Sequence, residues 1–229
     1  TLLTGYGGFN LSRTPAFSSL AAVWLESGGV FAEANMRGGG EFGEDWHRDG
    51  MLDRKQHVFD DFIAAAEHLI AEGYTSAEHL AIRGGSNGGL LVGAVSNQRP
   101  DLFGAVVCSY PLLDMVRYHQ FLVASFWVPE YGSSEDPEQF AYIYRYSPYH
   151  NVDETATYPA TLYITGDGDT RVAPLHGRKM AALMQATHGA ETPVLLRYHT
   201  DAGHSGGQPI SQQIEEMVDT VSFLLWQVG

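Results

Sequence analysis

The sequence predicts an α/β fold in which a mostly parallel sheet carries helices on both faces. Short strand-like runs alternate with longer runs at helical spacing along the whole chain. The strand-like runs are apolar almost throughout, which is typical of parallel strands that are buried on both sides. The chain has 229 residues, of which 44% are hydrophobic, so it can form one large domain with a substantial core.

The first half of the chain begins with a short strand at 2–3, which a glycine-rich loop at 5–9 follows. The clearest helix spans 55–72, because its apolar side chains recur at helical spacing. A later helix ends near residue 97, where a proline-containing segment begins. The other elements expected here are a helix at 17–26, a strand at 29–35, a glycine-rich loop at 37–43, and strands at 79–83 and 104–109.

The segment 111–150 is less regular and rich in aromatic residues, so we expect short helices joined by loops there. Regular alternation then returns, with strands expected at 160–165 and 193–198 and helices at 175–186 and 210–227. No repeat, low-complexity segment or linker interrupts the pattern. Residues 1–229 are therefore predicted to form one domain.

Composition excludes some classes of partner. A formal net charge of −14 argues against nucleic acid or an anionic membrane as the main partner. No apolar run reaches the roughly 18 residues that span a bilayer. The single cysteine, Cys108, cannot form an internal disulfide and is expected to be buried. The sequence begins at Thr1 without a signal-like segment and resembles a piece of a longer chain, so cytoplasmic and periplasmic locations both stay open.

The segment around Ser86 has the form of a nucleophile elbow. A strand-like run leads into Gly84-Gly85-Ser86-Asn87-Gly88, and a helix-like run leads out. A Gly-x-Ser-x-Gly motif at such a turn exposes the serine hydroxyl, and its glycines leave room for a strained backbone and a close strand–helix crossing. Because so short a motif also occurs by chance, its meaning depends on whether the chain supplies a base and an acid.

A nucleophilic serine needs a histidine base, and the base needs an acid that orients it. In the α/β-hydrolase fold these residues follow in the order serine, acid, histidine, and the last two lie just past later strands. Asp167 and Asp169 follow the predicted strand 160–165, and both stay open as the acid. His204 follows the strand 193–198 in a loop of small residues, whereas His199 is closer to the strand and is expected to be structural.

The oxyanion that forms in such a reaction needs preorganised donors. The backbone N–H of Asn87 is the first one expected, because it lies at a helix N-terminus whose dipole favours negative charge. The second is expected from the loop 5–9, as a backbone N–H or as the hydroxyl of Tyr6.

Two other kinds of site match parts of the sequence. Residues 38–43 fit the Gly-x-Gly-x-x-Gly pattern of dinucleotide sites, but the acidic residues that follow would repel a pyrophosphate. No Lys-Ser or Lys-Thr pair follows the glycines near Ser86, which argues against a phosphate loop. His199 and His204 around Asp201 could chelate a metal, but no H-E-x-x-H or C-x-x-C motif occurs. We therefore expect neither a cofactor nor a metal.

The most specific motifs are spread over nearly the whole chain. They are GYGGFN at 5–10, NMRGGGEFG at 35–43, GGSNGG at 84–89, NQRPDLFG at 97–104, YSPYHNV at 146–152, DTRVAPLH at 169–176 and AGH at 202–204. Together they resemble the catalytic domain of prolyl oligopeptidases. The resemblance implies Ser86 as nucleophile and His204 as base, and it favours Asp169 over Asp167, because the family's acid stands two residues before the arginine of Asp-x-Arg-Val.

The resemblance also implies roles for residues around the triad. It assigns the Tyr6 hydroxyl and the Asn87 N–H to the oxyanion, and Arg171 to a substrate carbonyl. Trp127 matches the residue that stacks on the proline ring. The residues that match the pocket walls are Phe9, Leu112, Tyr131 and Val172. A flat apolar slot of this kind suits a rigid pyrrolidine ring.

The sequence thus predicts a serine endopeptidase that cleaves short peptides after proline through an acyl-enzyme. An acyl-peptide-releasing enzyme or a carboxylesterase would use the same triad, and a non-catalytic binding module would share the fold. The family also carries an N-terminal β-propeller on which the catalytic domain packs, and strands that precede the Tyr6 loop. Both are expected to be missing from these 229 residues.

Overall fold

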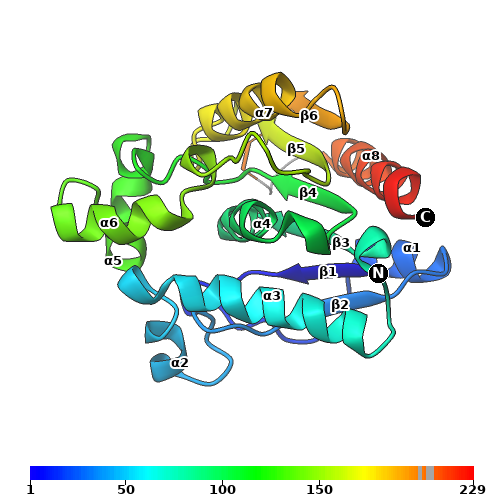
Figure 1. Ribbon diagram of the computed structural model, residues 1–229, viewed down its shortest axis with the longest axis horizontal. Helices are drawn as coiled ribbons and strands as arrows, with labels where there is room; N and C mark the ends of the chain where they lie inside the picture. Colours follow the sequence, from blue (N-terminus) through cyan, green and yellow to red (C-terminus); the bar gives the residue numbers. More distant parts are fainter. Residues whose placement is uncertain (201–202, 205–208) are drawn as a thin grey trace.

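A six-stranded, all-parallel sheet forms the centre of the part of the chain that the computed structural model describes, which is residues 1–200, 203–204 and 209–229 (Figure 1). The strand order is β2-β1-β3-β4-β5-β6. The N-terminal strand therefore lies inside the sheet, where Leu2 pairs with Phe31 on one side and with Ala81 on the other. The strands are β1 (Leu2–Gly5), β2 (Phe31–Ala34), β3 (Ala81–Gly85), β4 (Ala105–Ser109), β5 (Ala160–Gly166) and β6 (Val194–His199).

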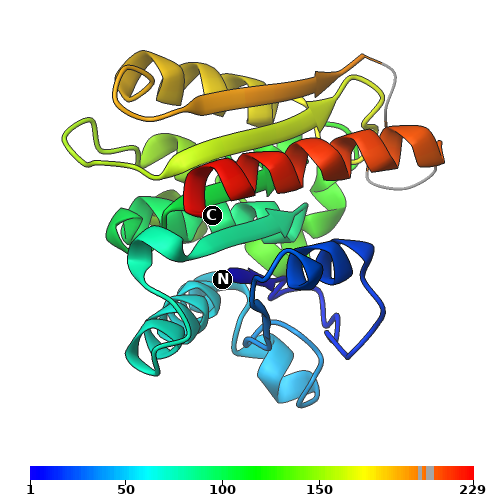
Figure 2. The ribbon, with the colours of Figure 1, turned by 90° about the vertical axis from the view of Figure 1, so that its right-hand side faces the viewer.

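Helices cover both faces of the sheet and divide the core into two clusters. Leu2 and Leu3, which point to opposite faces, belong to different clusters. One cluster joins the sheet to α1 (Ser19–Glu26) and α8 (Ile210–Val228), which lie in front of the sheet in Figure 2. The other cluster joins it to α3 (Gln56–Ala71), α4 (Asn87–Gln98) and α7 (Leu175–Thr187). This arrangement confirms the predicted fold class.

The predicted elements are confirmed with small shifts of their ends. The helix predicted at 17–26 begins at Ser19, because the side chain of Ser18 accepts the N–H of Ala21 and caps it. The strand predicted at 79–83 begins at Ala81, because a 3₁₀ turn occupies 77–79. The aromatic segment 111–150 forms short helices, of which α5 (Val128–Tyr131) and α6 (Pro137–Tyr146) are α-helical. A short helix that was not predicted, α2 (Glu44–Arg48), follows the loop 37–43.

Cys108 is buried as predicted, at 1% exposure in β4. Burial raises the pKa of its thiol well above the usual range, so the sulfur stays protonated and unreactive. None of the helices in the described part of the chain is both long and apolar enough to cross a membrane.

The turn between β3 and α4 depends on an unusually close crossing of backbone. Ser86 adopts φ 58° and ψ −119°, a conformation that side-chain-bearing residues rarely adopt. A Cβ atom at Gly84 would overlap the carbonyl oxygen of Gly88. A Cβ atom at the next residue, Gly85, would meet the carbonyl oxygen of Ser109 at 3.6 Å and its Cβ at 3.8 Å, which are ordinary contacts.

A buried histidine holds the loop that follows β4. His176 in α7 is 1% exposed, and its Nδ1 accepts the backbone N–H of Asp114 at 3.0 Å and of Leu113 at 3.4 Å. Burial lowers the pKa of His176 to about 4, and the nearby Asp114 carboxylate opposes this shift only in part. The folded protein therefore needs His176 in its neutral form.

We predict that Gly84→Ala destabilises the protein, because the added methyl group forces β3 and α4 apart. Overpacking of this kind costs about 1–3 kcal/mol in the free energy of unfolding. Gly85→Ala is the matched control, and we expect it to change stability by only about 0.5 kcal/mol. Denaturant unfolding of both variants measures the difference, and equal stabilities would contradict the proposed crossing constraint.

We predict that neutral His176 contributes to acid sensitivity. Its folded pKa of about 4 lies below the ordinary value of 6.5, so the unfolded chain binds the extra proton between these two values and stability falls as the pH falls through this window. The full loss is about 3 kcal/mol. His176→Asn keeps a hydrogen-bond acceptor but does not titrate. The stability gap between the wild type and this variant should shrink from pH 7 to pH 4, and a constant gap would refute the assignment.

Candidate active site

The predicted site residues gather at the carboxyl ends of the strands. Ser86 follows β3, Asp169 follows β5 and His204 follows β6. A pocket of about 1030 Å³ opens at this edge, and its lining includes Tyr6, Ser86, Arg171 and His204. The edge is shared because the strands are all parallel, so that loops distant in the sequence meet there.

Asp169 holds His204 by a short charge-assisted contact. Its Oδ2 lies 2.7 Å from Nδ1 of His204, and its side chain is fully buried. The other oxygen, Oδ1, accepts the backbone N–H groups of Arg171 at 2.9 Å and of Val172 at 2.8 Å. These three contacts fix the carboxylate. Because a carboxylate oxygen can only accept a hydrogen bond, Nδ1 of the imidazole carries the proton, and Nε2 of the neutral ring is left for chemistry in the pocket. The ring of Tyr110 packs edge-on against the imidazole, with 5.8 Å between centroids.

Two residues that the sequence offered as alternatives for the acid and the base, Asp167 and His199, make other contacts. Asp167 is exposed and accepts the hydroxyl of Tyr198, so of the two candidate acids it is Asp169 that contacts His204. His199 contacts Glu216 Oε2 at 3.2 Å. Asp201, which completed the metal alternative, lies outside the described residues.

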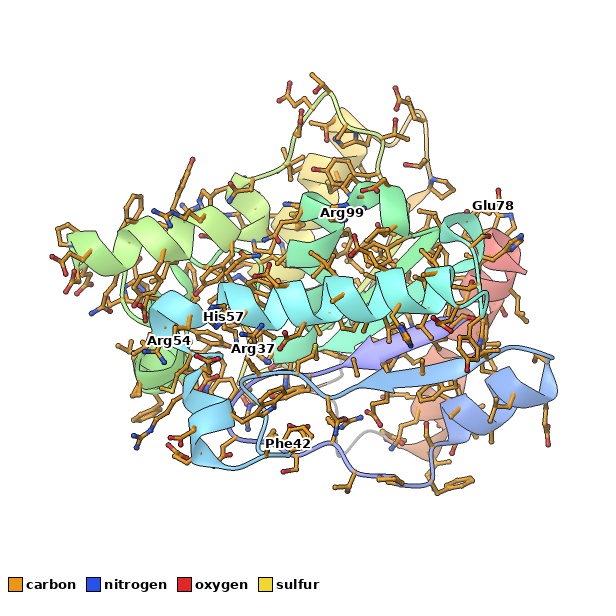
Figure 3. All side chains as sticks on the ribbon, turned by 60° about the horizontal axis from the view of Figure 1, so that its bottom comes forward. Arg37, Phe42, Arg54, His57, Glu78 and Arg99 are labelled. Atoms are coloured by element: carbon orange, nitrogen blue, oxygen red, sulfur yellow. The ribbon has the colours of Figure 1, made fainter. Side chains whose placement is uncertain are left out.

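The loop 37–43, which contains the dinucleotide motif, is held at its start by ion pairs of Arg37. Arg37 at its start donates to Asp61 of α3 at 2.6 Å, and Arg37 and His57 share contacts with Asp49 at the same end of α3 (Figure 3). The following helix α2 begins with acidic side chains, and its five residues form little more than one turn. A pyrophosphate would meet negative charge there, as expected from the sequence.

Tyr6 and Asn87 lie next to the serine. Burial raises the pKa of Tyr6, and the nearby side chain of Ser86 opposes this shift only in part. The phenol is therefore neutral and able to donate. The side chain of Asn87 bridges two segments, because Nδ2 donates to the Tyr6 carbonyl at 2.6 Å and Oδ1 accepts the Tyr131 hydroxyl at 2.7 Å. Its backbone N–H lies in the first turn of α4.

The residues predicted for the substrate pocket fall into three groups. Phe9 packs edge-on against Trp127 and Tyr131, with ring centroids 6.5 Å and 5.5 Å apart, so these three aromatics form one cluster. Trp127 is half-buried. Arg171 is exposed in the wall of the pocket that holds Ser86. The remaining two, Leu112 and Val172, are each only 2% exposed and belong to the core.

Sequence reasoning missed a group of charged residues close to the site. Lys55 and Glu130 are buried behind the loop that carries Tyr6, and Arg83 and Glu216 line the pocket with Ser86. The position of Arg83 directly before the elbow was a signal for the last pair. No local pattern pointed to Lys55 and Glu130, since they are distant in the sequence.

The chain is similar to several known proteins along its whole length. A prolyl endopeptidase of Elizabethkingia miricola is 47% identical over 230 residues, which cover 100% of this chain and 33% of that protein. A solved structure from a study of two prolyl endopeptidases shares 53% identity and a TM-score of 0.97 over 99% of this chain and 34% of its own. The structure of a post-proline cleaving enzyme from Rickettsia typhi has 40% identity and a TM-score of 0.95, with 99% and 33% covered.

The chain spans about a third of the length of the curated relatives it matches. Within the chain itself the match is nearly complete, because residues 15–229 fit the sequence profile of the prolyl oligopeptidase family. The fold, the order of the site residues and the relatives agree: this chain belongs to the prolyl oligopeptidase family.

Proposed function

We propose that this chain is the catalytic part of a serine peptidase that cleaves short peptides on the carboxyl side of proline. The observation that carries the proposal is the 2.7 Å contact between Asp169 and His204 in the pocket that also contains Ser86. A buried acid, an oriented imidazole and a serine at a strained turn are the components of nucleophilic acyl transfer.

Acylation begins when Ser86 Oγ attacks the peptide carbonyl and its proton passes to Nε2 of His204. The new oxygen–carbon bond produces a tetrahedral oxyanion, while Asp169 stabilises the imidazolium. When the carbon–nitrogen bond breaks, His204 gives its proton to the departing amine. A water molecule then enters, gives a proton to His204 and attacks the acyl carbon. The bond from this carbon to Ser86 Oγ breaks, His204 returns the proton to Oγ, and the acid product leaves.

Two donors are proposed for the oxyanion. The neutral Tyr6 phenol donates from one side, and the backbone N–H of Asn87 donates from the first turn of α4, where the helix dipole favours negative charge. Such donors are most effective when they are already in place before charge develops. The hydrogen bonds of the Asn87 side chain fix the backbone on which both donors depend.

The specificity for proline is proposed to come from the aromatic cluster. The half-buried rings of Trp127 and Phe9 offer an apolar surface to a pyrrolidine ring, and the fully buried Tyr131 packs on Phe9 behind it. Leu112 and Val172 would act from behind this surface, since they expose almost no area of their own. Arg171, exposed in the pocket wall, is placed to donate to a substrate carbonyl.

We further propose that a domain outside this sequence limits the size of the substrate. The curated relatives are about three times as long as the matched region, which leaves room for the β-propeller that the family resemblance implies. The relatives are a prolyl endopeptidase and a prolyl oligopeptidase, which favours a post-proline peptidase over an esterase or a binding module.

The first test compares a blocked Gly-Pro arylamide with its Gly-Ala equivalent, using the intact protein. We expect much faster release from the Gly-Pro substrate, because the aromatic slot fits the ring of proline. Ser86→Ala should abolish both activities and also labelling by a fluorophosphonate. Equal rates on the two substrates would refute the proline preference. Undiminished labelling of Ser86→Ala would refute the nucleophile.

The second test changes the proposed slot. We expect Trp127→Ala to lower kcat/KM for the Gly-Pro arylamide by about 10–100-fold, the range for a pocket contact worth about 1–3 kcal/mol. Turnover of a small activated ester should fall much less, because an ester does not need the slot. Phe126→Ala is the matched control, since Phe126 is 80% exposed. Equal losses on ester and arylamide would make Trp127 merely structural.

A further inference from the structure

Buried charges lie behind the loop that carries Tyr6 and Phe9. Lys55, at the start of α3, is 1% exposed, and Glu130, in α5, is 5% exposed. Nζ of Lys55 lies 3.6 Å from Oε1 of Glu130, and Nε2 of His47 in α2 lies 2.9 Å from Oε2. Residues from three separate segments therefore meet at one carboxylate.

These charges bind the loop backbone directly. Nζ of Lys55 donates to the carbonyl oxygen of Gly7 at 2.9 Å. The N–H of Phe9 donates to Oε1 of Glu130 at 3.0 Å. The carbonyl of Tyr6 is held in addition by the side chain of Asn87 at 2.6 Å. Backbone groups of three residues within this short loop are thus fixed by side chains from three other elements.

The same carboxylate connects the loop to the aromatic cluster. Glu130 directly precedes Tyr131, whose ring packs on Phe9 and whose hydroxyl donates to Asn87. The ammonium of Lys55 lies 5.3 Å from the centre of the Tyr131 ring. The proposed oxyanion donor and the proposed proline slot are therefore two ends of one connected structure.

Stability alone does not explain such an arrangement. Burial lowers the pKa of Lys55 to about 8, and the attraction of Glu130 opposes this shift without cancelling it. A buried ion pair is generally no more stabilising than apolar side chains of the same size, whereas it does impose a defined geometry. The charges here impose that geometry on the backbone next to Tyr6.

We propose that Lys55 and Glu130 are positioning residues, which hold the Tyr6 hydroxyl where the oxyanion forms and hold Phe9 against the proline slot. The proposal rests on the function proposed above. Neither residue touches the substrate. Each acts through the backbone of residues 6–9, so its removal misplaces Tyr6 and slows the chemical step more than it weakens substrate binding.

The test is a double-mutant cycle between Lys55→Met and Tyr6→Phe in the intact protein, with the Gly-Pro arylamide as substrate. Tyr6→Phe should lower kcat about 100-fold, as the loss of one oxyanion donor does. Lys55→Met should lower kcat about 10–100-fold with a smaller change in KM, because a misplacement near 1 Å has an effect of that size. The double variant should be little slower than Tyr6→Phe alone, since the lysine acts through the tyrosine.

Arg54→Met is the matched control, because Arg54 is the neighbour of Lys55 and is 57% exposed. It should leave kcat unchanged. If Lys55→Met does not fold, Glu130→Gln replaces it in the cycle, because the amide keeps the shape and the Phe9 contact while it removes the charge. Failure of both variants to fold would make the cluster purely structural and overturn the proposal.

The outcomes separate this inference from the proposed function. If the effects of Lys55→Met and Tyr6→Phe multiply in the double variant, the positioning role is wrong while the function stands. If Tyr6→Phe retains full kcat, the positioning role is wrong because Tyr6 is no oxyanion donor. If the protein neither cleaves the arylamide nor reacts with a fluorophosphonate, the proposed function itself has failed.

Discussion

The approach of β3 to α4 at Gly84 and Gly88 is the constraint on which the site depends. The backbone carbonyl of Gly88 occupies the space that a side chain at Gly84 would need. Because the two segments can approach so closely, the chain passes from β3 into α4 through the single residue Ser86, which has a positive φ. The same turn begins α4 at Asn87, so the first turn of the helix directly follows Ser86. One close contact thereby sets Ser86 and the backbone N–H of Asn87 together.

Much of this fold could be predicted because its signals are local. The spacing of apolar side chains identified α3 to within a residue of each end, and the apolar runs identified the buried strands. Element ends were less predictable, since they depend on caps such as Ser18. The helix α2 was missed because its charged sequence lacks apolar periodicity and it is only five residues long.

The site shows the same division between local and distant information. Chain order alone identified a serine, an acid loop and a histidine, but it left Asp167 and Asp169 equivalent. The family resemblance favoured Asp169, and the geometry shows that Asp169 is the one that contacts His204. The contact between Lys55 and Glu130 could not be predicted from spacing, because it depends on how α3 and α5 pack in three dimensions. The network around buried Asp114 illustrates the same limit, since Lys179 reaches it from α7 at 2.5 Å.

The place of β1 in the sheet has a consequence for folding. This strand pairs with β3, which follows it in the sequence only after β2, α3 and the residues between them. Tyr6, at the end of β1, therefore reaches Ser86 only after this non-local pairing has formed, and such pairings form late because loop closure costs entropy. His204 lies nearer the other end of the chain and must wait for β6. In a partly folded chain Ser86 therefore stands apart from Tyr6 and His204, and the three side chains come together only when the sheet is complete.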